Sequence, residues 1–245
     1  MWTFLHKLGS PRHFYRISGG MLPWLAWTTA LLMAAGLYGG LVLAPPDYQQ
    51  GESYRIIFIH VPSAWMSLFV YVIMAAAGAV GLVWRIKLAD VMAAASAPLG
   101  ASFTFLALVT GSLWGKPMWG TYWVWDARLT SELVLLFLYF GVMGLHAAIE
   151  DKRTASRAAA VLALVGVVNI PIIHYSVEWW STLHQGPTVT KFDAPSIHLS
   201  MLVPLLLMAL AFKLYYVTVL LMRARSEVLE RERSSAWVRE LARGT

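Results

Sequence analysis

The chain has 245 residues, of which 58% are apolar and only 13% are charged, whereas soluble domains carry roughly 25% charged residues. This composition excludes an ordinary soluble domain and predicts an all-α protein that crosses a membrane several times. The net charge of +6 does not indicate nucleic-acid binding, because the basic residues gather in particular loops. The absence of cysteine excludes disulfides, thiolate metal sites and covalent C-x-x-C-H haem attachment on this chain.

Six apolar runs are long enough to cross a hydrocarbon core, which takes about 20 residues. They cover residues 21–44, 58–84, 91–114, 129–149, 158–177 and 197–222. We therefore expect a membrane domain of six transmembrane helices over residues 21–222. Residues 1–20 mix aromatic and basic side chains and are predicted to lie on the membrane lipid surface, and residues 223–245 form a charged tail.

The positions of lysine and arginine predict the orientation of the bundle. Most of the 19 basic residues lie in the N-terminal arm, in the loops after the second and fourth spans, and in the tail. The other side carries only Arg55, Lys116, Arg128 and Lys191. By the positive-inside rule both termini are then cytoplasmic. We expect a bacterial inner-membrane protein whose less basic loops face the periplasm.

The second span opens with the sequence IHVPS, residues 59–63. Proline is tolerated in the first turn of a helix, which predicts that His60 lies at the outer mouth of this span. A helix N-terminus disfavours an imidazolium, so His60 is expected to stay neutral and able to bind a metal. The alternative is an interfacial histidine bonded to a neighbouring backbone group.

The stretch between the third and fourth spans, residues 114–130, concentrates four of the twelve tryptophans of the chain. It contains Trp114, Trp119, Trp123 and Trp125, followed by Asp126 and Arg128. Two glycines and a proline interrupt it, so we expect a shaped platform of aromatic rings and not one regular helix. Asp126 or Thr130 is expected to cap the fourth span, because each offers a side-chain oxygen to a first helical turn.

Two further histidines flank the end of the fifth span. His184 lies in a loop over residues 181–196, within a His-Gln-Gly-Pro turn signal, and is predicted to be exposed on the outer side. His174 lies inside the apolar run and is interpreted as a hydrogen-bonded core residue. His198, at the start of the sixth span, is a reserve ligand candidate.

His60, the tryptophan-rich stretch and His184 are all predicted on the outward face. Two neutral imidazoles and a flat apolar surface are what a haem requires, which indicates a non-covalent haem b with two histidine ligands or another planar cofactor. Arg128, with Arg55 across the mouth, could bind the two propionates, because guanidinium groups bind carboxylates in bidentate fashion. An aromatic belt around a packed bundle and a quinone site remain alternative interpretations of these residues.

Residues 119–130 read WGTYWVWDARLT and resemble the W-G-x-x-W-x-W-D-x-R-L-T signature of haem-handling membrane proteins in cytochrome c maturation. Six spans and one outward histidine on each side of the signature resemble the haem exporter protein C family in particular. The resemblance implies a protein that takes haem at the outer membrane face and presents it to a periplasmic haem chaperone. His60 and His184 would then be the axial ligands, the tryptophan-rich stretch with Asp126 would hold the ring, and Arg55 and Arg128 would hold the propionates.

The resemblance also implies partners: an ABC-type ATPase, its membrane subunit and a small single-span membrane protein. In this interpretation the chain is a binding and delivery protein and not an enzyme. Two other classes stay open at this point. One is a membrane subunit that passes electrons between quinone and haem, and the other is a haem-transporting permease subunit.

Overall fold

A computed structural model describes residues 10–184, 186, 189 and 194–243 of the chain, which form helices and no strand. The helices are α2 (Pro11–Tyr38), α3 (Ile57–Trp84), α4 (Lys87–Trp119), α5 (Ala127–Ala148), α6 (Lys152–Gly166), α7 (Asn169–Trp179), α8 (Leu199–Arg231) and α9 (Ala236–Arg243). A π-helical segment, η1 (Gly39–Leu43), ends α2, and a 3₁₀ helix, η2 (Glu52–Ile56), leads into α3.

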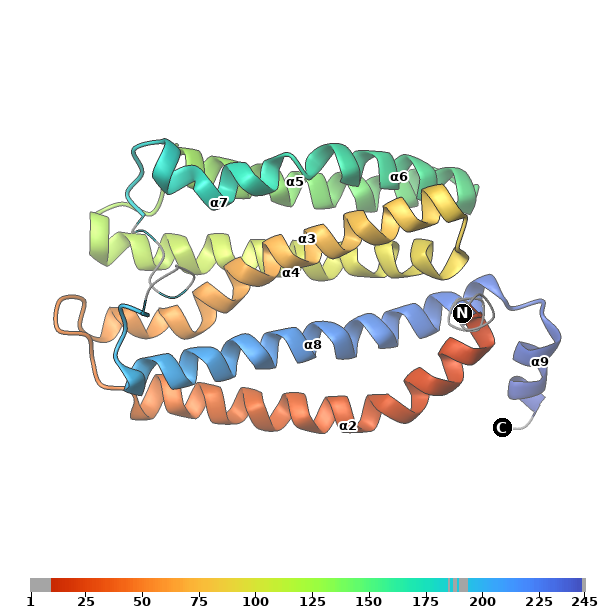
Figure 1. Cartoon of the computed structure of the whole chain (residues 1–245), viewed down its shortest axis with the longest axis horizontal. Helices are drawn as coiled ribbons and strands as arrows, with labels where there is room; N and C mark the ends of the chain where they lie inside the picture. Colours follow the sequence, from red (N-terminus) through yellow and green to blue (C-terminus); the bar gives the residue numbers. More distant parts are fainter. Residues whose placement is uncertain (1–9, 185, 187–188, 190–193, 244–245) are drawn as a thin grey trace.

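Six helical segments of the described chain are long and apolar enough to span a membrane. They are Pro11–Leu43, Glu52–Trp84, Lys87–Trp119, Ala127–Ala148, Lys152–Trp179 and Leu199–Arg231. The predicted all-α, six-span class is thereby confirmed. Both ends of the described chain lie at the same end of the bundle (Figure 1), as an even number of crossings requires.

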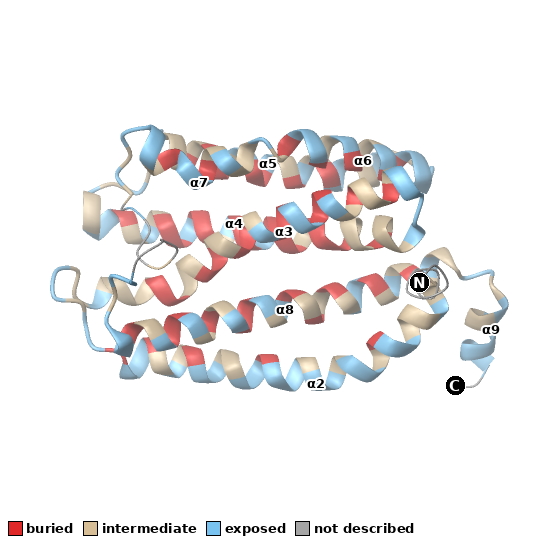
Figure 2. Cartoon of the chain, in the orientation of Figure 1, coloured by how far each residue is buried: buried red, intermediate tan, exposed pale blue. Residues whose placement is uncertain are grey.

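The bundle is organised around the hairpin of α3 and α4, which are joined by residues 85–86. Helix α8 packs against this hairpin on one side and carries α2 on its outer face, while α5, α6 and α7 pack on the other side (Figure 1). Buried residues are therefore concentrated on α3 and α4, and α2 is largely exposed (Figure 2). The exposed, apolar face of α2 is the composition expected of a surface in contact with lipid.

Two buried tyrosines connect the hairpin to the α5–α7 side. The rings of Tyr71 on α3 and Tyr139 on α5 meet edge to face, with centroids 5.1 Å apart, and the Tyr139 hydroxyl donates to the Ser67 carbonyl at 2.8 Å. Tyr139 lies directly over Gly100 of α4, where a Cβ atom would overlap its ring. Small residues allow this close helix approach, which fixes α5 against α3 and α4.

Helix α4 is longer than the predicted third span, because it continues through Trp114 to Trp119. Pro117 lies in its last turn, where the loss of one backbone donor does not break the helix. The helix ends at Gly120, which has a φ of 75° and whose N–H donates to the Lys116 carbonyl at 3.1 Å. The irregular part of the tryptophan-rich stretch is therefore residues 120–126, and Trp114 and Trp119 belong to a helix.

The other spans also differ from their predicted bounds. Helix α2 already begins at Pro11, within the segment predicted to lie on the membrane surface; residues 1–9 of that segment lie outside the described residues. Helix α8 continues into the predicted tail as far as Arg231. The fifth span is broken at residues 167–168 because Pro171 cannot donate a hydrogen bond to the carbonyl four residues earlier.

Candidate functional site

His60 lies near the beginning of α3, but not at a free helix terminus. The helix begins at Ile57 and is preceded without a break by η2, and Ile56 already has helical dihedrals. Pro62 therefore lies inside the helix, and the prediction that it occupies the first turn is wrong. A free helix N-terminus therefore cannot keep His60 neutral, contrary to the prediction. The protonation state of the imidazole depends instead on its side-chain contacts.

The contacts of His60 select one imidazole tautomer. Its Nδ1 lies 3.0 Å from the hydroxyl oxygen of Thr110 on α4, and that hydroxyl donates its single proton to the Leu106 carbonyl at 2.6 Å. The Thr110 oxygen can then only accept from His60, so Nδ1 carries the proton. The lone pair of Nε2 is left available, as an imidazole that binds iron requires.

The ring of Trp114 lies beside His60, one helical turn beyond Thr110 on the same face of α4. The Trp114 and His60 centroids are 5.6 Å apart at 75°, and Tyr54 meets the other side of Trp114 at 5.9 Å. The indole N–H of Trp114 donates to the Gln50 side-chain oxygen at 2.9 Å. Gln50 and Tyr54 thus hold this ring in one orientation next to the histidine.

His184 lies on the chain segment that follows α7. Its ring packs on Trp119, with centroids 5.1 Å apart, and its Nδ1 lies 3.7 Å from Oδ2 of Asp126. The other oxygen of Asp126 accepts from the Leu129 backbone N–H at 2.8 Å, which confirms Asp126 as the cap of α5. One carboxylate therefore both caps a helix and faces the imidazole.

Burial of His184 lowers its pKa to about 4, and the neighbouring Arg128 guanidinium contributes in the same direction. The Asp126 carboxylate opposes this shift of the His184 pKa but does not cancel it. His184 is therefore a neutral imidazole near pH 7. A neutral imidazole retains the lone pair that a metal ligand needs.

Arg128 is close enough to both histidines to interact electrostatically with each of them. Its guanidinium donates to the Ile173 carbonyl of α7 at 3.2 Å and has Asp126 and Glu132 as acidic neighbours. A guanidinium carries five N–H donors, so this bond leaves donors for an anionic ligand. His60 and His184 also interact electrostatically with each other, which places both imidazoles and Arg128 in one cluster.

The remaining predicted site residues form no hydrogen bond, ion pair or ring contact with either histidine in the described part of the chain. Trp123 and Trp125 pack edge to face at 5.3 Å, and no described ring contact joins them to either histidine. Trp125 is 76% exposed, and the buried indole N–H of Trp123 has no hydrogen-bond partner among the described residues. Arg55 pairs with Glu52 and donates to the Gly40 carbonyl at 3.1 Å, and no described contact joins it to the cluster.

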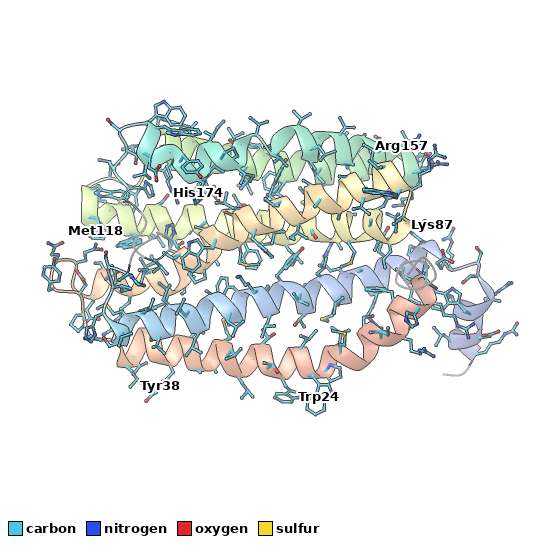
Figure 3. All side chains as sticks on the ribbon, viewed as in Figure 1. Trp24, Tyr38, Lys87, Met118, Arg157 and His174 are labelled. Carbon is cyan, nitrogen blue, oxygen red and sulfur yellow. The ribbon has the colours of Figure 1, made fainter. Side chains whose placement is uncertain are left out.

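The other outward histidines have different surroundings. His174 is exposed on the surface of α7 beside Tyr175 (Figure 3), so its interpretation as a core residue is wrong. It lies on the face of α7 opposite the buried residues Ile173 and Ser176. His198, the reserve ligand candidate, caps α8 by accepting from the Ser200 backbone N–H at 3.3 Å.

Sequence reasoning missed three residues of the site: Thr110, Gln50 and Tyr54. Thr110 lies in an apolar run, where a threonine normally bonds only to a carbonyl of its own helix. The one sequence feature that indicates a role for Thr110 in the site is its position four residues before Trp114, because that spacing places both residues on one helix face. Nothing in the sequence near Gln50 points to a tryptophan 64 residues away.

The donor set of the cluster suits a planar metal complex better than a bare ion. No group of three or more histidine, aspartate and glutamate side chains in the described ranges could hold a metal ion by itself. Two imidazoles supply the two axial positions of an iron already held by a macrocycle. Nδ1 of His184 and Oδ2 of Asp126 face each other at 3.7 Å without a hydrogen bond, and this contact would orient the imidazole of His184 toward an iron.

Known proteins with similar sequences are named for haem handling, in agreement with the two imidazoles and tryptophan rings of the site. Residues 4–239 match the family model described as Heme exporter protein C. The chain is 55% identical over 241 residues to Heme exporter protein C of Escherichia coli strain K12, covering 98% of this chain and 97% of the relative.

More distant relatives extend the match. Heme exporter protein C of Bradyrhizobium diazoefficiens is 53% identical over 98% of this chain and 90% of its own length. The putative cytochrome c biosynthesis ccmC-like mitochondrial protein of Marchantia polymorpha is 46% identical over 74% of this chain and 76% of its own length. The chain therefore belongs to the Heme exporter protein C family.

Proposed function

We propose that this chain binds haem b between His60 and His184 and delivers it to a periplasmic haem chaperone during cytochrome c maturation. The names of its relatives support haem handling and cytochrome c biosynthesis. The observation that carries the proposal is the convergence of His60, Arg128 and His184, from three separate parts of the chain, on one end of the bundle.

The two ligands would be held in different ways. His60 is fixed by α3 and by its bond to Thr110, whereas His184 is oriented by Asp126 and the Trp119 ring. Haem bound there supplies an iron that accepts two axial nitrogens. The protein binds this cargo with the lone pair of each imidazole, excludes water with Trp114 and Trp119, and offers Arg128 to a propionate.

Delivery requires that the bound cargo remain reachable from outside the bundle. Trp125 and Tyr122 are 76% and 57% exposed, and both lie in the irregular stretch of residues 120–126 next to Asp126. Exposed aromatic rings are favoured contacts at protein interfaces. We assign this surface to the chaperone. In this proposal the chain lies in a bacterial inner membrane and the site faces the periplasm. Other surfaces of the chain would contact an ABC ATPase, its membrane subunit and a single-span protein.

The test is an optical spectrum of the purified protein reconstituted with haem. We expect a Soret band of bis-histidine type in the wild type, and its loss or conversion in His60→Ala and His184→Ala. His174→Ala and His198→Ala are matched controls, because both remove an exposed histidine that lies outside the cluster. Full haem binding in the two site variants, or equal losses in the controls, would contradict the proposal.

The same preparation distinguishes this function from that of a subunit that transfers electrons between quinone and haem. Such a subunit would take up two haems per chain and would reduce them with an added quinol. A stoichiometry of one haem, with no reduction by quinol, distinguishes the delivery function from it.

A further inference from the structure

A cavity of about 510 Å³ lies at the end of the bundle opposite the histidine cluster. Figure 3 marks this end by Lys87 and Arg157, and the other end by Met118. Six basic side chains line the cavity, namely Arg85, Lys87, Lys152, Arg153, Arg157 and Arg231, against the two acidic side chains Asp90 and Glu232. Its remaining wall is apolar and includes Leu82, Leu88, Val91 and Val228.

The acidic residues do not neutralise this lining. Glu232 pairs with Lys87 at 3.8 Å, and Arg231 pairs with Glu227 at 2.6 Å. Within the described part of the chain, Arg85 and Arg157 form no ion pair. The cavity therefore keeps an excess of positive charge next to an apolar wall.

The cavity also contains a buried hydroxyl without a partner. Ser156 lines the cavity and is only 6% exposed, yet its Oγ makes no hydrogen bond to any described residue. A serine in an apolar helix normally satisfies its hydroxyl on a carbonyl of the preceding turn. An unpaired buried hydroxyl costs free energy that a ligand oxygen can recover.

The start of α4 lines the same cavity through Lys87 and Leu88. Ile86, the residue before α4, provides no side-chain cap, and its carbonyl accepts from the N–H groups of Ala89 and Asp90. The N–H groups of Lys87 and Leu88 therefore have no hydrogen-bond partner among the described residues. Arg85 has a φ of 56°, the one positive φ of a non-glycine residue in the described chain, and this turn places the start of α4 against the end of α3. Helix N-termini bind phosphate groups through such donors.

We propose that this cavity binds the phosphate of an anionic phospholipid, whose acyl chains lie along the apolar wall. The cavity is at the end of membrane-spanning helices, where lipid headgroups lie, and basic pockets between such helices recognise anionic headgroups. The residues that line it in the described part of the chain include no histidine, methionine or aromatic ring. It therefore offers nothing that would ligate iron, and no surface on which a nucleotide base would stack.

The proposal is tested by titrating the detergent-purified protein with phosphatidylglycerol and following its thermal unfolding midpoint. We expect a saturable rise with phosphatidylglycerol and a much smaller one with phosphatidylcholine. The triple variant Arg85→Gln/Lys87→Gln/Arg153→Gln should bind phosphatidylglycerol on the order of 100-fold more weakly. Arg223→Gln/Arg239→Gln/Arg243→Gln is the matched control, because it removes the same charge outside the cavity and should bind like wild type.

Inorganic phosphate and ATP are tested separately as probes of a free-phosphate site. Equal protection by either probe, equal binding of the two lipids, or an equal loss in the control triple variant would overturn the proposal. If the cavity triple variant does not fold, Ser156→Ala decides the question. It should keep haem absorption and bind phosphatidylglycerol about fivefold more weakly, and unchanged lipid affinity in it would then overturn the proposal.

Discussion

The end of the bundle that holds His60 and His184, here called the histidine end, and the end that holds the basic cavity share helices α3 and α4. They differ in the side chains that a ligand would touch. The histidine end combines imidazoles with tryptophan rings and one central guanidinium, Arg128. The basic cavity combines six cations with aliphatic walls.

If both proposals hold, one pair of helices carries two sites with unrelated ligand preferences. A flat iron complex needs axial nitrogens and ring-shaped walls, whereas a phosphate needs N–H donors and positive charge. The described lining of the basic cavity has no imidazole, and the histidine cluster has one guanidinium, Arg128, where the cavity has six basic side chains. If the two ends are independent, a substitution at one end should leave ligand binding at the other end unchanged.

The largest effect is expected from the double variant His60→Ala/His184→Ala. Removing both axial ligands should weaken haem binding by more than 100-fold, because second-shell partners alone are worth about 10- to 100-fold. Phosphatidylglycerol binding should stay within twofold of wild type, since the sites share no side chain. Spectroscopic haem titration and lipid titration of the same preparation measure both, and a parallel loss would show that the ends are coupled.

A smaller effect is expected at Thr110, which selects the tautomer of His60. Thr110→Val keeps the shape of the side chain and removes the hydroxyl, so Nδ1 loses its acceptor and haem affinity should fall by about 10- to 100-fold. Thr110→Ser keeps the hydroxyl and is the matched control. Equal affinities of the two variants in a haem titration would show that the hydrogen bond to Thr110 has no role.

Asp126→Asn is expected to weaken haem binding by about tenfold. Asparagine caps helices as well as aspartate does, so the thermal unfolding midpoint should hardly change, while the carboxylate that faces His184 is lost. Asp151→Asn, at the cap of α6, makes the same change away from the histidine end. A haem affinity that drops equally in both variants would argue against a local role of Asp126.

The smallest effect is expected from acidification. The pKa of His184 is lowered from 6.5 to about 4, so between these values the unfolded chain binds the proton and the folded chain does not. Stability contributed by neutral His184 is complete above pH 6.5 and is lost as the pH falls toward 4. As far as His184 is concerned, haem affinity should change less than twofold between pH 7 and 5.5, and a half-loss near pH 6.5 in a spectroscopic pH titration would contradict this.

The six spans and the cap at Asp126 could be predicted because they depend on local sequence. Apolar run length identifies a membrane helix, and a side-chain oxygen before an apolar run identifies a helix start. The end of α4 could not be placed, since Pro117 and the nearby glycines indicate a break that the helix in fact tolerates until Gly120. The exposed position of His174 likewise depends on which face of α7 packs against α5.

The composition of the site was only partly predictable for a related reason. His60, Trp114, Trp119, Asp126, Arg128 and His184 were candidates because of their residue type. Their partners Thr110 and Gln50 carry no such signal, because their roles exist only once α3, α4 and the loop before η2 are packed together. Arg55 shows the converse: its charge suggested a ligand contact, while the packed structure gives it Glu52 and Gly40 as partners.

The continuity of α4 has a mechanical consequence for release of the cargo. Its 33 residues form a rod about 50 Å long at 1.5 Å per residue, and Thr110, Trp114 and Trp119 keep a fixed spacing along it. His60 is tied to this rod through Thr110, whereas His184 lies outside every helix. In the proposed haem site, a movement that separates the two imidazoles would therefore leave His60, Trp114 and Trp119 in place and displace His184.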